Sequence, residues 1–255
     1  MNYENYQRLR LLSYNIQAGV DTQHFGQYLT QGWKHVLPHR ERLANLNGIA
    51  SMIGSYDIVG LQEVDSGSLR SGFLDQTEYL AHRAQFPFWF KQINRSLGKF
   101  AQHSNGVLSR MRPTSVDEHR LPGLPGRGVI VCHFGREAGL VVCIMHLALG
   151  QRARLRQMRF VSELVAHYTH VIVMGDLNCS GDSREMQLLL QSSNLREPCC
   201  QQGTFPSWRP MRKLDHILVS ESLLVENARV LDYPFSDHLP IGIDVLVPEG
   251  LELAA

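Results

Sequence analysis

Val171-Ile-Val-Met-Gly-Asp-Leu-Asn178 joins four apolar residues to a glycine and to two polar residues that flank a leucine. A short, continuous apolar run of this kind is typical of a β-strand that is covered on both faces. In open sheets, functional groups collect where strands end, because loops converge there on a rigid frame. Asp176 and Asn178 are therefore candidate site residues, although a simple Asx turn would explain them equally well.

Similar strand-like runs recur along the whole chain. Strands and helices that alternate in this way predict an α/β or α+β domain with at least one large sheet. The other runs occupy residues 10–16, 57–61, 105–110, 128–134, 140–146, 214–219 and 241–247.

Helical periodicity appears between the strand-like runs, in residues 39–54, 152–168 and 182–191. The last of these follows a candidate N-cap at Asp182, with Glu185 three positions later. Residues 18–38 and 65–74 read as loops, and loops of this length are often functional.

The composition indicates one globular domain, residues 1–255, because the chain is 44% apolar and has no long Pro/Gly linker. Lys and Arg number 25 against 24 Asp and Glu, so bulk positive charge gives little support to nucleic-acid binding. Five irregularly spaced cysteines do not form a disulfide framework. We find neither a signal peptide nor a transmembrane segment, and therefore expect a cytoplasmic protein.

Polar side chains accompany six of the strand-like runs. Singly, each has a structural explanation, such as a turn for Asn15, a surface position for Glu63 or a hydrogen-bonded core position for His146. Together, these carboxylates, amides and imidazoles are typical of metal-assisted phosphoryl transfer, in which oxygen donors suit Mg²⁺ or Mn²⁺. The residues are Asn15, Glu63, His146, Asp176 with Asn178, Asp215 with His216, and Asp237 with His238.

The ordered motifs resemble those of the endonuclease/exonuclease/phosphatase family, over residues 12 to about 245. That resemblance implies a four-layer sandwich of two packed mixed β-sheets flanked by helices, and Mg²⁺-dependent hydrolysis of phosphate esters. The motifs are Leu12-Ser-Tyr-Asn-Ile16, Gly60-Leu-Gln-Glu-Val64, Met145-His-Leu147, Gly175-Asp-Leu-Asn178, Leu214-Asp-His216 and Ser236-Asp-His-Leu-Pro240.

The resemblance also implies a metal site. Glu63 would be the principal ligand of Mg²⁺, with Mn²⁺ as a substitute, and Asn15 and Asp237 would lie close to the ion or its waters.

Catalytic roles follow from the same resemblance. Asp176 would activate the attacking water, Asn178 would hold the water or a phosphate oxygen, and His146 would contact the phosphate. His238 would stabilise the phosphate or act as the base, with Asp215 holding its ring. The sequence leaves open whether Asp176 or His238 takes the proton.

Two basic stretches lie near these motifs. We interpret Arg152, Arg154, Arg156 and Arg159 as a solvated helix face. The second stretch, residues 208–213, precedes Asp215, and there we expect Arg209 and Arg212 to bind substrate.

Three functions remain open on the sequence. The first is a phosphodiesterase or phosphatase that acts on a phosphate-ester substrate. A DNA or RNA nuclease with the same site is the second, although the near-neutral charge weighs against it. The third is a binding module without catalysis, which the intact set of acidic and imidazole side chains disfavours.

Overall fold

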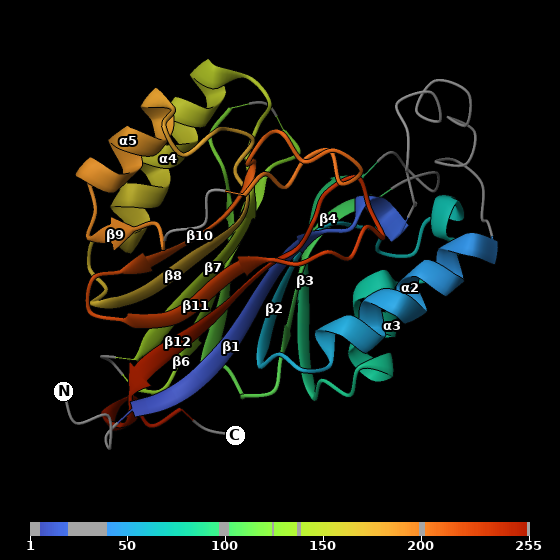
Figure 1. Ribbon diagram of the computed structural model, residues 1–255, viewed down its shortest axis with the longest axis horizontal. Coiled ribbons are helices and arrows are strands. Elements are labelled where there is room, and N and C mark those ends of the chain that lie inside the picture. The colour runs from blue at the N-terminus through green and yellow to red at the C-terminus, as the bar shows by residue number, and fades with distance from the viewer. Residues whose placement is uncertain are drawn as a thin grey trace.

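Two six-stranded β-sheets form the centre of the computed structural model, which describes residues 6–19, 40–96, 102–123, 125–136, 139–198 and 202–253 (Figure 1). The first sheet has the order β11 (Leu224–Val230), β12 (Ile241–Pro248), β1 (Tyr6–Asn15), β2 (Ile58–Val64), β4 (Gln102–Ser109) and β3 (Phe88–Ser96). The second has the order β5 (Ser115–Arg120), β6 (Gly128–Phe134), β7 (Leu140–His146), β8 (His170–Asp176), β10 (Asp215–Ser220) and β9 (Leu195–Arg196).

Each sheet is mixed and has a parallel pair at its centre, β1 with β2 and β7 with β8. β12 runs antiparallel to β1, and β10 runs antiparallel to β8. The carboxyl ends of the parallel strands therefore lie at the same end of the sandwich as the beginnings of β10 and β12. This explains why the predicted site residues lie near the end or the beginning of a strand.

The central strands, such as β7 and β8, are nearly continuous in apolar residues because both faces of each sheet are covered there, as the continuous runs predicted. In β1, Leu9 and Leu11 pack between the sheets, whereas Leu12 and Tyr14 face the helices. The sheets approach closely at Gly60, where an added Cβ would lie 2.9 Å from Met174 Cε. A side chain at position 60 would displace Met174 or Ile144, which pack there between the two sheets.

Helices cover the outer face of each sheet (Figure 1). α2 (Arg40–Ile53) and α3 (Gln76–Arg83) bury Leu46, Ile49 and Leu80 against the first sheet. α4 (Gln151–Val165) and α5 (Arg184–Gln191) bury Met158, Val161 and Leu189 against the second. The predicted four-layer sandwich is thus confirmed. Short 3-10 turns occupy Gln17–Gly19, Leu69–Ser71 and Glu249–Leu251.

Several elements were missed by the sequence patterns. β5 and β11 are partly exposed edge strands whose side chains do not form an apolar run. β3, the two-residue β9 and the eight-residue α3 also lie outside the predicted elements. Periodicity detects buried elements, and it fails where an element is short or half-solvated.

One predicted helix cap is wrong. α5 begins at Arg184, and its N-cap is Ser183 rather than Asp182. The Ser183 hydroxyl accepts a hydrogen bond from the Met186 backbone N at 3.2 Å. The difference is one residue, and it arises because both side-chain types are good caps.

Most of the predicted loop 18–38 lies outside the described residues. Among the described helices, none combines the length and apolar character that crossing a membrane requires.

Candidate active site

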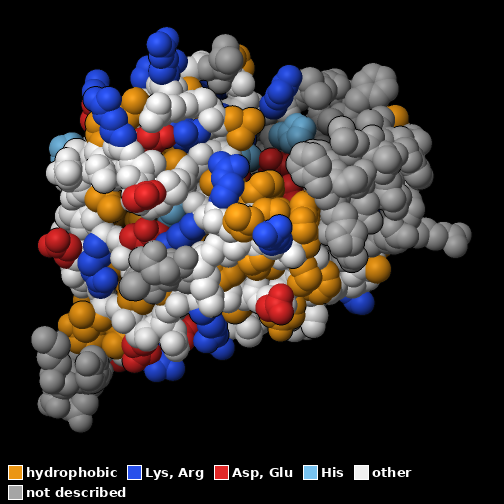
Figure 2. All heavy atoms as spheres, turned by 45° about the horizontal axis from the view of Figure 1, so that its top comes forward, with side chains coloured by type: hydrophobic (Ala, Val, Ile, Leu, Met, Phe, Trp, Pro, Cys, Tyr) orange, Lys and Arg blue, Asp and Glu red, His pale blue; other side chains and the backbone are white. Residues whose placement is uncertain are grey.

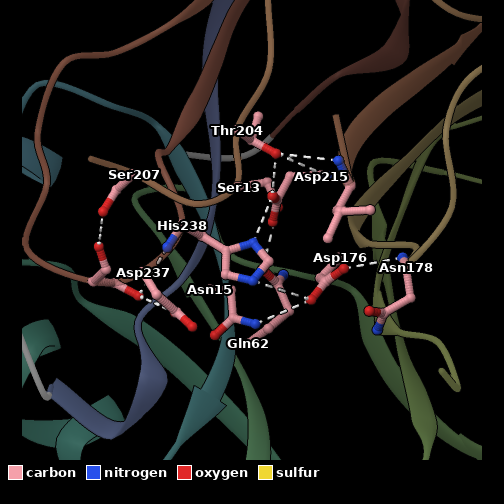
Figure 3. A network of polar contacts seen from close by, with 12 residues as sticks. Ser13, Asn15, Gln62, Asp176, Asn178, Thr204, Ser207, Asp215, Asp237 and His238 are labelled. Carbon is pink, nitrogen blue, oxygen red and sulfur yellow. Dashed lines mark hydrogen bonds and ion pairs between the residues drawn. The ribbon is translucent and has the colours of Figure 1, made fainter. Parts of the chain in front are cut away.

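Asp176, the last residue of β8, belongs to the polar network drawn in Figure 3, where it lies between His238 and Asn178. Asn15 Nδ2 donates a hydrogen bond to Asp176 Oδ2 at 3.1 Å, which links the end of β1 to the end of β8. The Asn178 backbone N donates to Asp176 Oδ1 at 3.0 Å, so the Asx turn considered from sequence is present. Gly175 permits this turn, since a Cβ there would lie 1.8 Å from the Met145 carbonyl oxygen.

Asn178 is held by a second contact. Its Nδ2 donates to the Leu147 carbonyl at 2.9 Å, and its backbone has a φ of 54°, a left-handed conformation that asparagine tolerates. Asn178 therefore joins the end of β8 to the loop that follows β7.

His146 comes from β7 of the second sheet, and Glu63 comes from β2 of the first. His146 Nε2 lies 3.3 Å from Asp176 Oδ2, and His146 Nδ1 lies 3.9 Å from Glu63 Oε1. Glu63 has a φ of 55° and lies where the β2–β4 register shifts. Such a bulge re-aims a side chain, and here Glu63 faces His146.

Asp215 and His238 form a buried carboxylate–imidazole pair beside Asp176 (Figure 3). His238 Nδ1 lies 2.7 Å from Asp215 Oδ2, and its Nε2 lies 3.8 Å from Asp176 Oδ2. Thr204 Oγ1 donates to the same Asp215 oxygen at 2.6 Å. Asp215 thus fixes the ring between two carboxylates.

Asp237 adds a further buried carboxylate. Its Oδ1 accepts a hydrogen bond from Ser236 Oγ at 3.2 Å, and its carbonyl accepts one from the Ser207 backbone N at 2.7 Å. These bonds fasten the loop after Thr204 to the segment that precedes β12.

Burial and mutual charge shift the pKa values of these groups. Burial raises the pKa of Asp176 and that of Asp237, each to about 6. Burial alone would lower the pKa of His238, but the charges of Asp215 and Asp176 raise it to about 10. For His146, burial lowers the pKa well below its ordinary value, and the charge of Arg127 acts in the same direction.

The arrangement is suited to a cation. Ligand atoms of Asp176, Asp215 and His238 lie within 4.8 Å of one another, which makes them a candidate metal site. Asp215 Oδ1 is buried and has no hydrogen-bond partner among the described residues. Several close carboxylates repel one another, and a bound cation would offset that repulsion.

A cavity of about 710 Å³ adjoins this network and shares Glu63 and His146 with it. Figure 2 shows acidic and histidine side chains at the border of the grey region, with Lys and Arg side chains beside them. Arg95, Arg127, Arg152 and Arg156 line the cavity. The sequence had not singled out Arg95 or Arg127, because no local motif marks them.

The structure thus brings together Asn15, Glu63, His146, Asp176, Asn178, Asp215, Asp237 and His238 from separate segments. Arg209 and Arg212 are exposed and do not line the cavity, and their predicted role in substrate binding stays a prediction. Thr204 was not assigned a role from the sequence, since only the fold shows that it contacts Asp215.

The helix-face interpretation of the α4 arginines is partly wrong. Arg154 does not face solvent, because its Nη2 lies 2.7 Å from the buried Glu185 Oε1. Arg152 and Arg156 are exposed but line the cavity. His216, next to Asp215, is directed elsewhere and bonds Glu197 Oε1 at 2.7 Å.

Comparisons with known proteins agree with this fold. The sequence matches the Endonuclease/Exonuclease/phosphatase family over residues 12–238. Among curated proteins, no significant match is found. A solved endonuclease/exonuclease/phosphatase from Beutenbergia cavernae DSM 12333 has a TM-score of 0.72 and 19% identity, covering 95% of this chain and 72% of that one.

Two other solved structures carry more specific descriptions. The mannosyl-6-phosphatase Bt3783 of Bacteroides thetaiotaomicron VPI-5482 has a TM-score of 0.70 and 19% identity, covering 94% of this chain and 100% of that one. ANGEL2, described as a 2′,3′-cyclic phosphatase, has a TM-score of 0.64 and 14% identity, covering 96% of each chain. At these identities the likeness concerns the fold.

Proposed function

Because the chain belongs to the endonuclease/exonuclease/phosphatase family, whose members are phosphoester hydrolases, we propose that it hydrolyses phosphate esters with Mg²⁺ or Mn²⁺. The phosphatase described for Bacteroides thetaiotaomicron and the cyclic phosphatase ANGEL2 support this class of reaction. The observation that carries the proposal is the buried Asp176, which lies against Asn15, His146 and His238 from three other segments.

Asn15, Glu63 and Asp237 would hold the cation in this proposal. All three offer oxygen atoms, the ligands that hard divalent cations prefer. When bound, the cation would neutralise phosphate oxygens and the charge on the leaving oxygen. We assign the Asp215–His238 pair to proton chemistry instead, because its 2.7 Å contact already occupies His238 Nδ1.

Asp176 is the base in this proposal. Its two oxygens are fixed by Asn15 and Asn178, so it can take a proton from a water placed in the network. The water oxygen then bonds to phosphorus, and the ester P–O bond breaks with its electron pair leaving on the ester oxygen.

His238 stabilises the phosphate in this proposal. A ring between two carboxylates favours the doubly protonated form, so its Nε2 acts as a donor toward a phosphate oxygen. His146, which burial keeps neutral, also contacts the phosphate in this proposal, since its Nε2 lies 3.3 Å from the same Asp176 oxygen.

Hydrolysis of bis(p-nitrophenyl) phosphate with Mg²⁺ or Mn²⁺ tests the proposal. Activity should disappear with a chelator and return with added metal. Asp176→Asn should lower the rate by roughly 10²-fold or more, the scale of a lost proton-transfer group, whereas the exposed Asp182→Asn should not. Wild-type rates in Asp176→Asn would refute the catalytic assignment, and failure to bind Mg²⁺ with the fold intact would favour a binding module.

Nuclease activity is the second candidate, favoured by exposed Arg209 and Arg212 on a loop fastened beside the site. Plasmid nicking should then depend strongly on salt concentration. An absence of cleavage of any nucleic acid at low salt would exclude it.

A further inference from the structure

The cavity beside the proposed catalytic network has a wall of positive charge. Arg95, Arg127, Arg152 and Arg156 line it, and the only carboxylate among its described lining residues is Glu63. None of the four arginines forms a direct ion pair with a carboxylate in the described part of the chain. Because like charges repel, four gathered guanidinium groups favour an anionic occupant.

The arginines come from three segments that pack against one another. Arg95 is the penultimate residue of β3, and it packs on Gly126, where an added Cβ would lie 3.4 Å from Arg95 Cβ. Arg127 belongs to the loop before β6, while Arg152 and Arg156 lie on the first two turns of α4. The basic wall is therefore a tertiary feature rather than one flexible stretch.

Polar contacts fix the third segment, the loop from β7 into α4. Gln157 Oε1 accepts a hydrogen bond from the Ala148 backbone N at 2.9 Å, and Gln157 Nε2 donates to the Pro122 carbonyl at 3.2 Å. Arg154 pairs with Glu185 and also donates to the Ala148 carbonyl at 3.2 Å. The arginines thus stand on a preorganised frame.

The start of α4 adds to the positive character of the cavity. Gly150, Gln151 and Arg152 line it, Gly150 provides no side-chain cap, and the first turn has no acidic residue. Unpaired backbone N–H groups and the helix dipole at such an end favour an anion. The helix end thus adds to the attraction for an anion that the four arginines already provide.

The cavity continues into the proposed catalytic network. Glu63 and His146 line both the cavity and the network. Burial lowers the pKa of His146, and the charge of Arg127 lowers it further. Burial also lowers the pKa of Arg127, against which the charges of Glu63 and Asp176 act. A volume of about 710 Å³ is in the range of small-molecule sites.

We propose that this arginine pocket binds a second phosphoryl group of a small substrate, separate from the one that is hydrolysed. The inference rests on the proposed function and narrows the class of substrate to small molecules that carry two phosphates. Arginine suits this role because its planar fork bonds phosphate oxygens in pairs.

Two matched substrate sets test the pocket: adenosine 3′,5′-bisphosphate against the 3′- and 5′-monophosphates, and fructose 1,6-bisphosphate against the two monophosphates. The wild-type protein should release phosphate from at least one bisphosphate with a kcat/KM about 10- to 100-fold higher than from its monophosphates, the scale of two partly screened arginine–phosphate contacts. Arg152→Gln with Arg156→Gln should abolish this ratio. Arg159→Gln, an exposed arginine of the same helix outside the pocket, should preserve it.

Calorimetric titration of adenosine 3′,5′-bisphosphate in EDTA separates the pocket from the chemistry. Tighter binding of the bisphosphate than of either monophosphate, lost in the double variant, supports the pocket even if no hydrolysis occurs and the proposed function fails. Active protein with equal kcat/KM for mono- and bisphosphates in both sets overturns the pocket and leaves the proposed function standing. Cleavage and binding confined to polynucleotides would also overturn it.

Discussion

Replacing Asp215 with asparagine removes one negative charge and almost no volume. Asp215 is fully buried, and its Oδ2 lies 2.7 Å from His238 Nδ1. A hydrogen bond to a charged group contributes about 1.5–3 kcal/mol, against about 0.5–1.5 kcal/mol for a neutral pair. The substitution therefore removes about 1–1.5 kcal/mol from the interaction that orients His238 and keeps it charged.

We expect this loss to appear in the rate of phosphate-ester hydrolysis. At about 1.4 kcal/mol per factor of ten, Asp215→Asn should lower kcat by about 10-fold, and by about 150-fold if the whole interaction is lost. The assay is the initial rate on bis(p-nitrophenyl) phosphate at saturating metal. The pKa of His238 should also fall from about 10, because the imidazolium loses a carboxylate partner, and NMR titration of its ring can follow this change.

The chain provides a matched control outside the site. Asp117, an exposed carboxylate on β5, lies 3.2 Å from His133 Nε2. Asp117→Asn breaks a similar pair and should leave kcat unchanged within about twofold, as expected for a surface substitution. If Asp215→Asn retains more than half of the wild-type kcat while its thermal unfolding is normal, the reasoning about this pair is wrong.

Three further predictions concern stability. Ser183→Ala should lower the free energy of unfolding in urea by about 1 kcal/mol, whereas Asp182→Ala should not; equal losses would contradict the cap assignment. Gly60→Ala should cost about 1–3 kcal/mol in thermal unfolding because its methyl group would overpack the two sheets, and an unchanged stability would mean that they are less tightly packed there. Burial alone would raise the pKa of Glu197, but its imidazole and ammonium partners lower it. The stabilisation that Glu197 gains from these partners is present above the ordinary pKa of glutamate and is lost as pH falls through its lowered pKa. Glu197→Gln should therefore be less stable than wild type at neutral pH and equal to it in acid. A deficit that does not change with pH would refute this.

The sequence by itself determined the buried strands and most of the helices. Runs such as 129–132 and 140–145 are apolar without interruption, so they must lie between two covering layers. The candidate residues were also evident, because polar side chains next to such runs are unusual and the motifs keep the order of a known family.

Only the tertiary structure decided which of these groups act together. Asp215 and His238 are 23 positions apart, and only the family resemblance implied that they pair. The structure gives their 2.7 Å contact and shows that Thr204 donates to the same Asp215 oxygen. The arginine pocket is a stronger case, since Arg95, Arg127 and Arg152 come from three segments, and no motif marks Arg95 or Arg127. Sequence patterns report which face of an element is buried, whereas distances between elements depend on how the two sheets pack and where their strands end.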